Sequence, residues 1–179
     1  NIFHRVGDCI MPREGVFAIV KNGGVMKIGD VMVAELPKAD APLRAAVMTL
    51  SDKGFAGERV DESGPKAVAM LEAAGYEIVE TLLLPDAQKK IERELIRLAD
   101  SRQVDLIITT GGTGMSVRDC TPEATLAVAT RNVPGIAEAI RAGSMAITKR
   151  AMLGRGASVL RNNTLIVNLP GSVKAVEES

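Results

Sequence analysis

Aromatic residues, histidine and cysteine are scarce in this sequence of 179 residues, and its charges balance. It has no Trp, one Tyr, three Phe, one His and two Cys, and 22 basic side chains match 22 acidic ones. Few aromatic platforms and no net positive charge argue against a nucleic-acid partner. A single histidine cannot form a multi-histidine site, so any bound metal is expected to take oxygen ligands and to be Mg²⁺ rather than Zn²⁺.

Other absences concern the compartment and the membrane. Cys9 and Cys120 lie far apart and form no metal-ligand spacing, which favours a reduced cytoplasmic protein over a disulfide scaffold. No long uninterrupted apolar segment is present, so we expect no membrane span. Because residue 1 is Asn rather than Met and the last apolar pattern stops after two helical turns, we expect the natural chain to be longer.

The first 42 residues differ in pattern from the rest. Short apolar runs alternate with turn residues over 1–36, which predicts β-hairpin strands. Residues 37–42 contain two prolines and little to bury, so we expect a linker. From residue 43 onward, apolar runs alternate with helical periodicity. This alternation predicts an α/β domain with a parallel sheet covered by helices.

The same patterns locate the elements of the α/β domain. We expect strands at 44–50, 77–84 and 104–108, and two paired strands at 157–160 and 164–168. Helices are expected after Ser63, after Asp86, at 122–130, at 136–148 and after Ser172, with a short apolar turn at 151–153. Small polar residues are predicted as N-caps of four helices, namely Ser63, Asp86, Thr121 and Ser172.

A glycine-rich loop follows the third predicted strand. Residues 109–114, Thr-Thr-Gly-Gly-Thr-Gly, can bring backbone N–H groups close to an anion. A Walker loop requires Gly-Lys-Ser/Thr, but Met115 follows Gly114. A dinucleotide fingerprint beginning at Gly112 requires Gly or Ala at position 117, where Val117 stands. The loop therefore predicts an anion site of neither standard type, although a tight turn without a ligand also explains the glycines.

Polar or glycine-rich loops follow four predicted strands, and parallel strands bring such loops to one edge of the sheet. These loops begin at Ser51, Pro85, Gly111 and Pro170. Asp86 and Asp119 would then flank the glycine loop, and two carboxylates beside bound phosphate indicate a shared Mg²⁺. A helix cap at Asp86 and a solvated loop position at Asp119 are the simpler alternatives.

Six motifs stand in fixed order between residues 43 and 179. They are Leu50-Ser51-Asp52, Ser63-Gly64-Pro65, Leu84-Pro85-Asp86, the 109–114 loop, Arg118-Asp119-x-Thr121-Pro122-Glu123-Ala124 and Asn168-Leu169-Pro170-Gly171. As a set they resemble the molybdopterin-binding domain of molybdopterin adenylyltransferases, enzymes of molybdenum cofactor biosynthesis. The resemblance implies a doubly wound α/β fold, with helices on both faces of a mostly parallel sheet, and a homotrimer.

The resemblance also implies a reaction and a set of site residues. The family joins the terminal phosphate of molybdopterin to the α-phosphate of ATP, with Mg²⁺, and releases pyrophosphate. Motif positions assign catalysis and metal binding to Asp86 and Asp119. They assign substrate binding to Gly111, Gly112, Thr113, Gly114, Ser144 and Arg155. They assign nucleotide binding to Ser51, Asp52, Pro170 and Gly171.

One position departs from the family pattern. Relatives have Leu-Ser-Arg where this chain has Leu153-Gly154-Arg155, which removes a hydroxyl near the expected pterin site. A non-catalytic module that binds molybdopterin or transfers the cofactor therefore stays open as an alternative. A third hypothesis is an unrelated α/β protein that binds ATP and ignores pterin.

The N-terminal segment carries a second, shorter resemblance. Met11-Pro12-Arg13-Glu14-Gly15-Val16-Phe17, with Gly23-Gly24 and Ile28-Gly29-Asp30, resembles the closing strands of a molybdenum cofactor sulfurase C-terminal domain. The expected organisation is a remnant of that domain at 1–36, a linker at 37–42 and an adenylyltransferase domain at 43–179.

Overall fold

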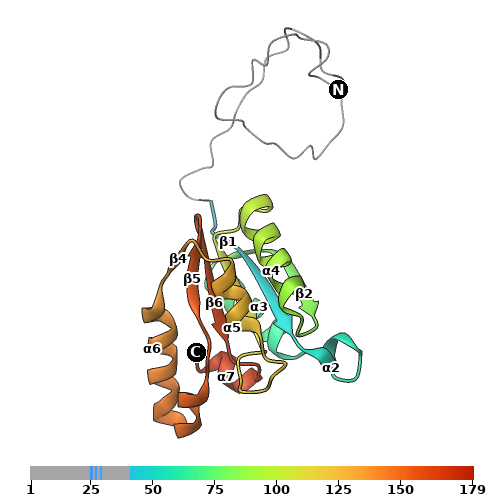
Figure 1. The fold of residues 1–179 in the computed structure, drawn as a ribbon. Helices are drawn as coiled ribbons and strands as arrows, with labels where there is room; N and C mark the ends of the chain where they lie inside the picture. Colours follow the sequence, from blue (N-terminus) through green and yellow to red (C-terminus); the bar gives the residue numbers. More distant parts are fainter. Residues whose placement is uncertain (1–24, 26, 28, 30–40) are drawn as a thin grey trace. The chain divides into compact units, whose positions relative to one another are not determined.

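The computed structural model describes residues 25, 27, 29 and 41–179, and Figure 1 shows their fold. Apart from these positions, the predicted β segment 1–36 and the linker 37–42 lie outside the described residues. Residues 39–179 form one compact unit. Within the described residues, no helix is long and apolar enough to cross a bilayer.

Six strands form one sheet in the order β2-β1-β3-β6-β5-β4. Strands β2, β1, β3 and β6 are parallel, and β5 and β4 run antiparallel at the other edge. The bounds are β1 Arg44–Leu50, β2 Glu77–Leu84, β3 Leu106–Thr110, β4 Arg131–Asn132, β5 Ser158–Arg161 and β6 Thr164–Leu169. The predicted, mostly parallel sheet is confirmed.

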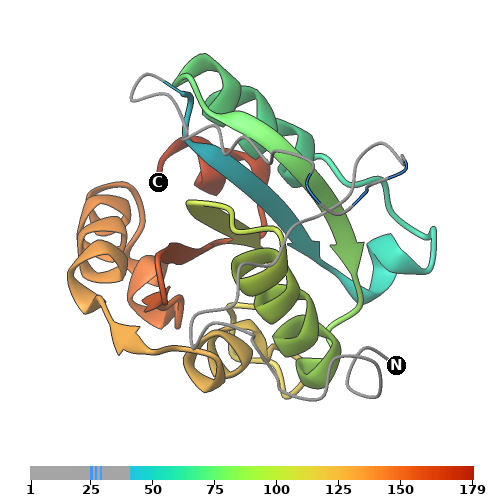
Figure 2. The ribbon, with the colours of Figure 1, turned by 90° about the horizontal axis from the view of Figure 1, so that it is seen from above.

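Helices cover both faces of the sheet, as Figure 2 shows. The bounds are α2 Asp52–Phe55, α3 Ser63–Ala73, α4 Gln88–Ile96, α5 Thr121–Ala127, α6 Pro134–Ile147 and α7 Val173–Glu177. A π-helix, η1, follows α4 at Arg97–Ser101, and a 3₁₀-helix, η2, follows α6 at Lys149–Leu153. The expected helices are present, whereas the short elements α2 and β4 were not predicted.

Side-chain alternation along β1 divides the core in two. Ala46, Met48 and Leu50 pack with α4, η1 and α5 on one face. Ala45 and Val47 pack with α3, α6 and α7 on the other. These β1 side chains are all buried, as expected for a central strand of a parallel sheet.

The third strand lies two residues later than predicted. The expected bounds were 104–108, but β3 spans Leu106–Thr110. Val104 is buried, yet its N–H donates to the carbonyl of Leu98 and so closes the turn after η1. Thr109 and Thr110 continue the ladder with β6, and both are fully buried. Apolar composition therefore placed the start too early, because the apolar Val104 belongs to the turn, and the end too early, because the polar Thr109 and Thr110 continue the strand.

Two of the predicted N-caps, Ser63 and Ser172, concern helices α3 and α7. The prediction for Ser172 is confirmed, because its Oγ accepts a hydrogen bond from Ala175 N at 3.2 Å. The prediction for Ser63 is wrong. Helix α3 begins at Ser63 itself, and Oδ1 of Asp61 accepts from Gly64 N at 3.0 Å. The side chain of Asp61, which is longer than that of serine, reaches the free N–H group of Gly64 from two residues before Ser63.

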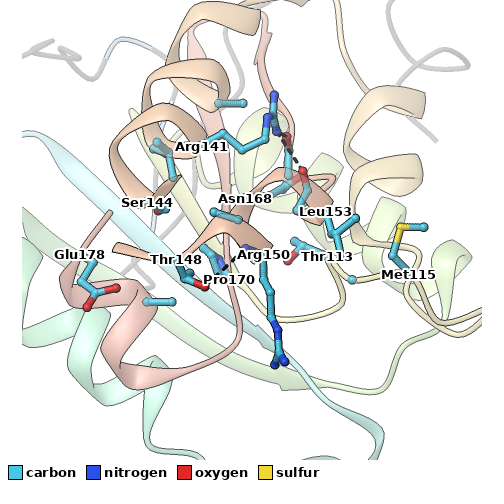
Figure 3. A pocket seen from close by; sticks show the side chains of 17 residues that line it. Thr113, Met115, Arg141, Ser144, Thr148, Arg150, Leu153, Asn168, Pro170 and Glu178 are labelled. Carbon is cyan, nitrogen blue, oxygen red and sulfur yellow. Dashed lines mark hydrogen bonds between the residues drawn. The ribbon is translucent and has the colours of Figure 1, made fainter. Parts of the chain in front are cut away.

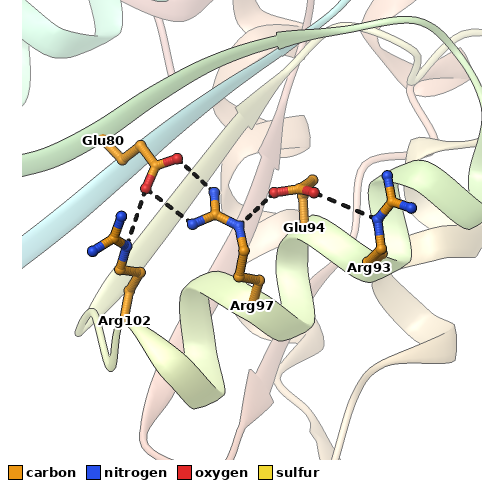
Figure 4. A network of polar contacts seen from close by, with 5 residues as sticks. All are labelled: Glu80, Arg93, Glu94, Arg97 and Arg102. Carbon is orange, nitrogen blue, oxygen red and sulfur yellow. Dashed lines mark hydrogen bonds and ion pairs between the residues drawn. The ribbon is translucent and has the colours of Figure 1, made fainter. Parts of the chain in front are cut away.

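A charged network joins the edge strand β2 to α4 and η1 (Figure 4). The Arg97 guanidinium contacts Glu80 at 2.5 Å and Glu94 at 2.6 Å, and Arg102 contacts Glu80 at 3.3 Å. The hydrogen bond from Arg97 lowers the pKa of Glu80. Charge pairing therefore fastens the edge strand to the helix that covers it.

Asn168 links four elements inside the domain. Its Nδ2 donates to the hydroxyls of Thr109 on β3 and Thr125 on α5, each at 2.9 Å. Its Oδ1 accepts from Ala157 N, next to β5, at 3.1 Å. Because the residue is only 3% exposed, water cannot replace these partners without opening the domain.

We expect Asn168→Ala to lower the free energy of unfolding by about 3 kcal/mol, because several buried polar groups lose a partner together. Urea denaturation monitored by circular dichroism measures the change. Asn132→Ala, at an exposed β4 position, is the matched control and should leave stability nearly unchanged. Equal effects of the two substitutions would contradict the role of Asn168 as a buried link.

Candidate functional site

The glycine loop leaves β3 at the carboxyl ends of the parallel strands. Gly111 and Gly112 have φ values of +96° and +62°. A Cβ on Gly111 would lie 2.2 Å from the carbonyl oxygen of Leu50, at the end of β1. A Cβ on Gly112 would lie 2.7 Å from Oδ1 of Asp86. Both conformation and space therefore require glycine at these two positions.

Thr121 anchors this loop instead of capping α5. Its hydroxyl donates to the carbonyl of Gly111 at 3.0 Å, and its N–H donates to the carbonyl of Gly112 at 3.2 Å. The predicted N-cap role of Thr121 is wrong, because α5 begins at Thr121 and Cys120 occupies the N-cap position. The hydroxyl finds a buried carbonyl from a distant segment, and this holds the start of α5 against the loop.

One cavity, the polar cavity, lies at the ends of β1, β2 and β3 and measures about 360 Å³. Six of the predicted site residues line it, namely Ser51, Asp86, Gly111, Gly112, Asp119 and Gly171. Thr49, Arg59, Asp61 and Thr110 also line it and were not predicted. The loop 51–62 was recognised from its glycines, but no pattern distinguished Arg59 and Asp61 within it.

A second cavity, the larger cavity, lies on the other side of the glycine loop and measures about 430 Å³ (Figure 3). Four of the predicted site residues line it, namely Thr113, Gly114, Ser144 and Pro170. Arg141, Thr148, Arg150 and Gly154 also line it. The helix that carries Arg141 was predicted, but the sequence does not show which of its sides faces a cavity.

Asp86 lines the polar cavity and has one unpartnered carboxylate oxygen. Its Oδ2 accepts from Asp52 N at 3.1 Å, whereas its Oδ1 is buried and has no hydrogen-bond partner. The helix-cap prediction for Asp86 is wrong, because α4 begins at Gln88 and no side chain caps it. Burial raises the pKa of Asp86, and the nearby carboxylates of Asp52 and Asp119 raise it further. An orphaned carboxylate oxygen of this kind is suited to a cation or a hydrogen-bond donor of a ligand.

Asp52 and Arg118 form an ion pair beside Asp86. Arg118 donates to Oδ1 and Oδ2 of Asp52 at 2.8 and 2.9 Å, and this contact lowers the pKa of Asp52. Asp86 N donates to Oδ1 of Asp52 at 3.0 Å. Asp52 therefore supports Asp86 from behind and does not itself line either cavity.

Asp119 and Arg155 take different positions around the loop. Asp119 lines the polar cavity, and its Oδ2 accepts from Ser116 N at 2.9 Å. Arg155 lines neither cavity, and its guanidinium donates to the carbonyls of Gly114 and Asp119, each at 2.7 Å. The structure thus brings Asp86 and Asp119 to one cavity and places Arg155 behind the loop.

The donor set of the polar cavity fits a magnesium ion. In the described part of the chain, no three His, Cys, Asp or Glu side chains are grouped to hold a metal. Asp86 and Asp119 nevertheless face one cavity, and the buried Oδ1 of Asp86 lacks a partner. Mg²⁺ needs only one or two carboxylates when phosphates and water complete its shell, so these two residues would hold it.

Comparison with known families identifies the domain. A family model described as "Probable molybdopterin binding domain" matches residues 46–179. The chain belongs to this family. The resemblance expected for the α/β part of the chain is thereby confirmed, whereas the sulfurase-like origin of residues 1–36 stays a prediction.

Named relatives of this molybdopterin-binding domain are similar over most of their length. The molybdopterin adenylyltransferase of Haemophilus influenzae is 43% identical over 141 residues, covering 78% of this chain and 72% of the relative. That of Escherichia coli K12 is 41% identical over 140 residues, covering 76% and 71%. The crystal structure of the molybdopterin biosynthesis enzyme MoaB from Thermus thermophilus matches with a TM-score of 0.72 at 43% identity, covering 76% and 86%. This likeness agrees with the doubly wound fold.

We expect Asp86→Asn to raise the unfolding temperature at pH 7 by roughly 2 °C, because it removes a half-buried charge that desolvation and neighbouring carboxylates disfavour. The folded-state pKa of Asp86 lies above its unfolded value, so the wild-type domain loses stability as the carboxyl ionises. The difference should vanish when the pH falls below the ordinary aspartate value, about 3.9. Differential scanning calorimetry across this pH range measures it.

Glu72→Gln is the charge-matched control, because Glu72 is exposed on α3, away from both cavities. This variant should unfold at the wild-type temperature. An unchanged or lower midpoint for Asp86→Asn at pH 7 would contradict the cost assigned to the buried carboxylate.

Proposed function

We propose that residues 43–179 form a molybdopterin adenylyltransferase of molybdenum cofactor biosynthesis. The enzyme joins the terminal phosphate of molybdopterin to the α-phosphate of ATP and releases pyrophosphate. One observation carries the proposal: two cavities adjoin a single glycine loop, so two substrates can meet across it. The relatives that are 41% and 43% identical bear the name of this enzyme.

The two cavities suit different substrates. The larger cavity combines apolar side chains such as Ile140 and Leu153 with Ser144 and Thr113, a lining that fits a pterin ring with polar edges. The polar cavity carries Ser51, Asp86, Asp119 and the glycine backbone, which fits a nucleotide and its phosphates. We therefore place molybdopterin in the larger cavity and ATP in the polar one, with Pro170 and Gly171 between them.

The glycine loop supplies donors for phosphate. Among the described residues, no acceptor takes the backbone N–H groups of Gly112, Thr113 and Gly114. Successive free N–H groups in a turn with positive φ form a concave anion site. In the proposed complex they bind phosphate oxygens at the point where the two substrates meet.

The reaction needs alignment more than a protein base. An oxygen of the anionic molybdopterin phosphate attacks the α-phosphorus of ATP, a new P–O bond forms, and the bond to the bridging oxygen breaks. Pyrophosphate departs with that electron pair, so no Ser-His or Cys-His pair is required. Asp86 and Asp119 would hold Mg²⁺, which supplies positive charge beside the triphosphate when it is bound. The chain orients the phosphates and neutralises their charge.

Oligomeric state, cellular location and an upstream domain also belong to the proposal. We propose a homotrimer, a cytoplasmic location and an upstream sulfurase-like domain ending near residue 36. Exposed apolar side chains outside the cavities support self-association, namely Met145, Ile147 and Met152. Scarce cysteine supports the cytoplasm, and the motif at 11–17 supports the upstream domain.

Mixed with molybdopterin, ATP and Mg²⁺, the chain should release pyrophosphate, which a coupled phosphate assay measures. We expect Asp86→Ala and Asp119→Ala each to lower kcat by about 100-fold, because charge positioning at the triphosphate is lost. Glu72→Gln should turn over at the wild-type rate. Omission of molybdopterin should abolish pyrophosphate release, which separates this enzyme from a general ATPase.

Two outcomes would contradict the proposal. Normal turnover in both aspartate variants would refute the site assignment. Tight molybdopterin binding without ATP consumption by the wild-type chain would instead support a non-catalytic module.

Gly154→Ser tests the one departure from the family pattern. Gly154 has φ −70°, which any residue adopts, and an added Cβ would lie 3.2 Å from the carbonyl oxygen of Ala151. We expect the new hydroxyl to lower the Kd for molybdopterin by about 5-fold, the effect of one added hydrogen bond. Isothermal titration calorimetry measures the change.

Gly143→Ser is the matched control, because a Cβ there meets open space and Gly143 lies outside the larger cavity. It should bind molybdopterin as the wild type does. If Gly154→Ser also leaves the affinity unchanged, residue 154 does not face the bound pterin.

A further inference from the structure

Arg155 connects the wall of the larger cavity to the glycine loop. Its neighbours Gly154 and Gly156 line that cavity, and the carbonyls of both accept hydrogen bonds from Arg141 at 3.1 and 3.2 Å. The segment is therefore fixed against α6. From this fixed segment the Arg155 side chain extends away from the cavity and behind the loop.

Arg155 holds the loop at several points. Its backbone N–H donates to the carbonyl of Thr113 at 3.1 Å, and its Nε donates to the carbonyl of Gly114 at 2.7 Å. One guanidinium nitrogen donates to the carbonyl of Asp119 at 2.7 Å, and the other pairs with the carboxylate of Glu123 on α5. One residue thus contacts both ends of the segment 114–119 and the helix that follows it.

Hydrophobic burial does not hold this segment. Met115 is 71% exposed and Val117 is fully exposed, so neither packs against the core. Within the segment, Ser116 and Asp119 exchange two hydrogen bonds, of 2.9 and 3.0 Å. A loop with so little buried apolar surface opens easily unless polar contacts restrain it. Arg118 pairs with Asp52 from the middle of the segment, and the Arg155 contacts restrain its two ends.

The two ends of the segment belong to different cavities. Thr113 and Gly114 line the larger cavity, and Asp119 lines the polar cavity. The planar guanidinium presents its N–H groups in a fixed arrangement, so it sets the relative position of the two carbonyls that it binds. A lysine ammonium carries the same charge but cannot reproduce this geometry.

We propose that Arg155 is a positioning residue that holds the loop between the two cavities in one conformation. It thereby fixes the position of Asp119 relative to the larger cavity. The inference rests on the proposed function for its catalytic consequence. It also revises the sequence-based expectation for Arg155, because a direct contact with substrate would require these loop bonds to break.

The test uses Arg155→Lys in the full chain. In the pyrophosphate assay, kcat should fall by about 10-fold while the KM values for ATP and molybdopterin stay within about twofold of wild type. Amide hydrogen exchange, followed by mass spectrometry, should be at least about 10-fold faster at Ser116 and Asp119. This second readout does not depend on catalysis.

Arg161→Lys is the matched control. Arg161 contacts the Asp100 carboxylate at 3.0 Å and the carbonyl of Val128 at 2.8 Å, and it lines neither cavity. Its substitution keeps the charge and removes a comparable guanidinium arrangement, and it should change neither kcat nor exchange in the loop. The comparison separates a general loss of stability from a specific loss of loop position.

Wild-type kcat in Arg155→Lys would overturn the proposal, as would a raised KM for molybdopterin at unchanged kcat, the result of a direct substrate contact. Unchanged exchange at Ser116 and Asp119 would overturn it even if the wild-type chain did not turn over. Faster exchange in a chain without activity would support the loop restraint and would refute only the proposed reaction.

Discussion

The close approach of Gly111 to the carbonyl oxygen of Leu50 is the constraint on which the site depends. With no room for a Cβ between them, the chain leaves β3 directly across the end of β1. The loop then passes between the polar cavity and the larger cavity, and the hydroxyl of Thr121 holds it there. A bulkier residue at position 111 would push the loop away and join or close the two cavities.

The unpartnered oxygen of Asp86 shows that the fold gives up stability beside the polar cavity. Burial and neighbouring carboxylates disfavour its charge, yet Asp52 and Arg118 hold it in place and Gly112 approaches it closely. The site is therefore prepared for positive charge or a donor that a ligand brings. Such a cost is common where a protein must bind an ion or a reacting group.

Several elements could be predicted closely from the sequence, and the reasons are local. Strands β1 and β2 have the predicted bounds because stretches rich in apolar residues end at turn residues. Helix caps were less predictable. Ser63, Asp86 and Thr121 all had the residue type and position of a cap, but each found a different role or partner. A polar side chain can bond locally or across the fold, and composition does not decide between them.

By itself, the sequence determined the α/β alternation, the glycine loop and the ordered motifs that place the chain in its family, since these depend on residue type and spacing. Only the tertiary structure decided that two cavities flank the loop, that Asp86 keeps a free oxygen and that Arg155 lies behind the loop. Asp52 and Asp86 are 34 residues apart, and Arg155 and Gly114 are 41 apart. Such contacts arise from the order of strands in the sheet, which no local pattern encodes.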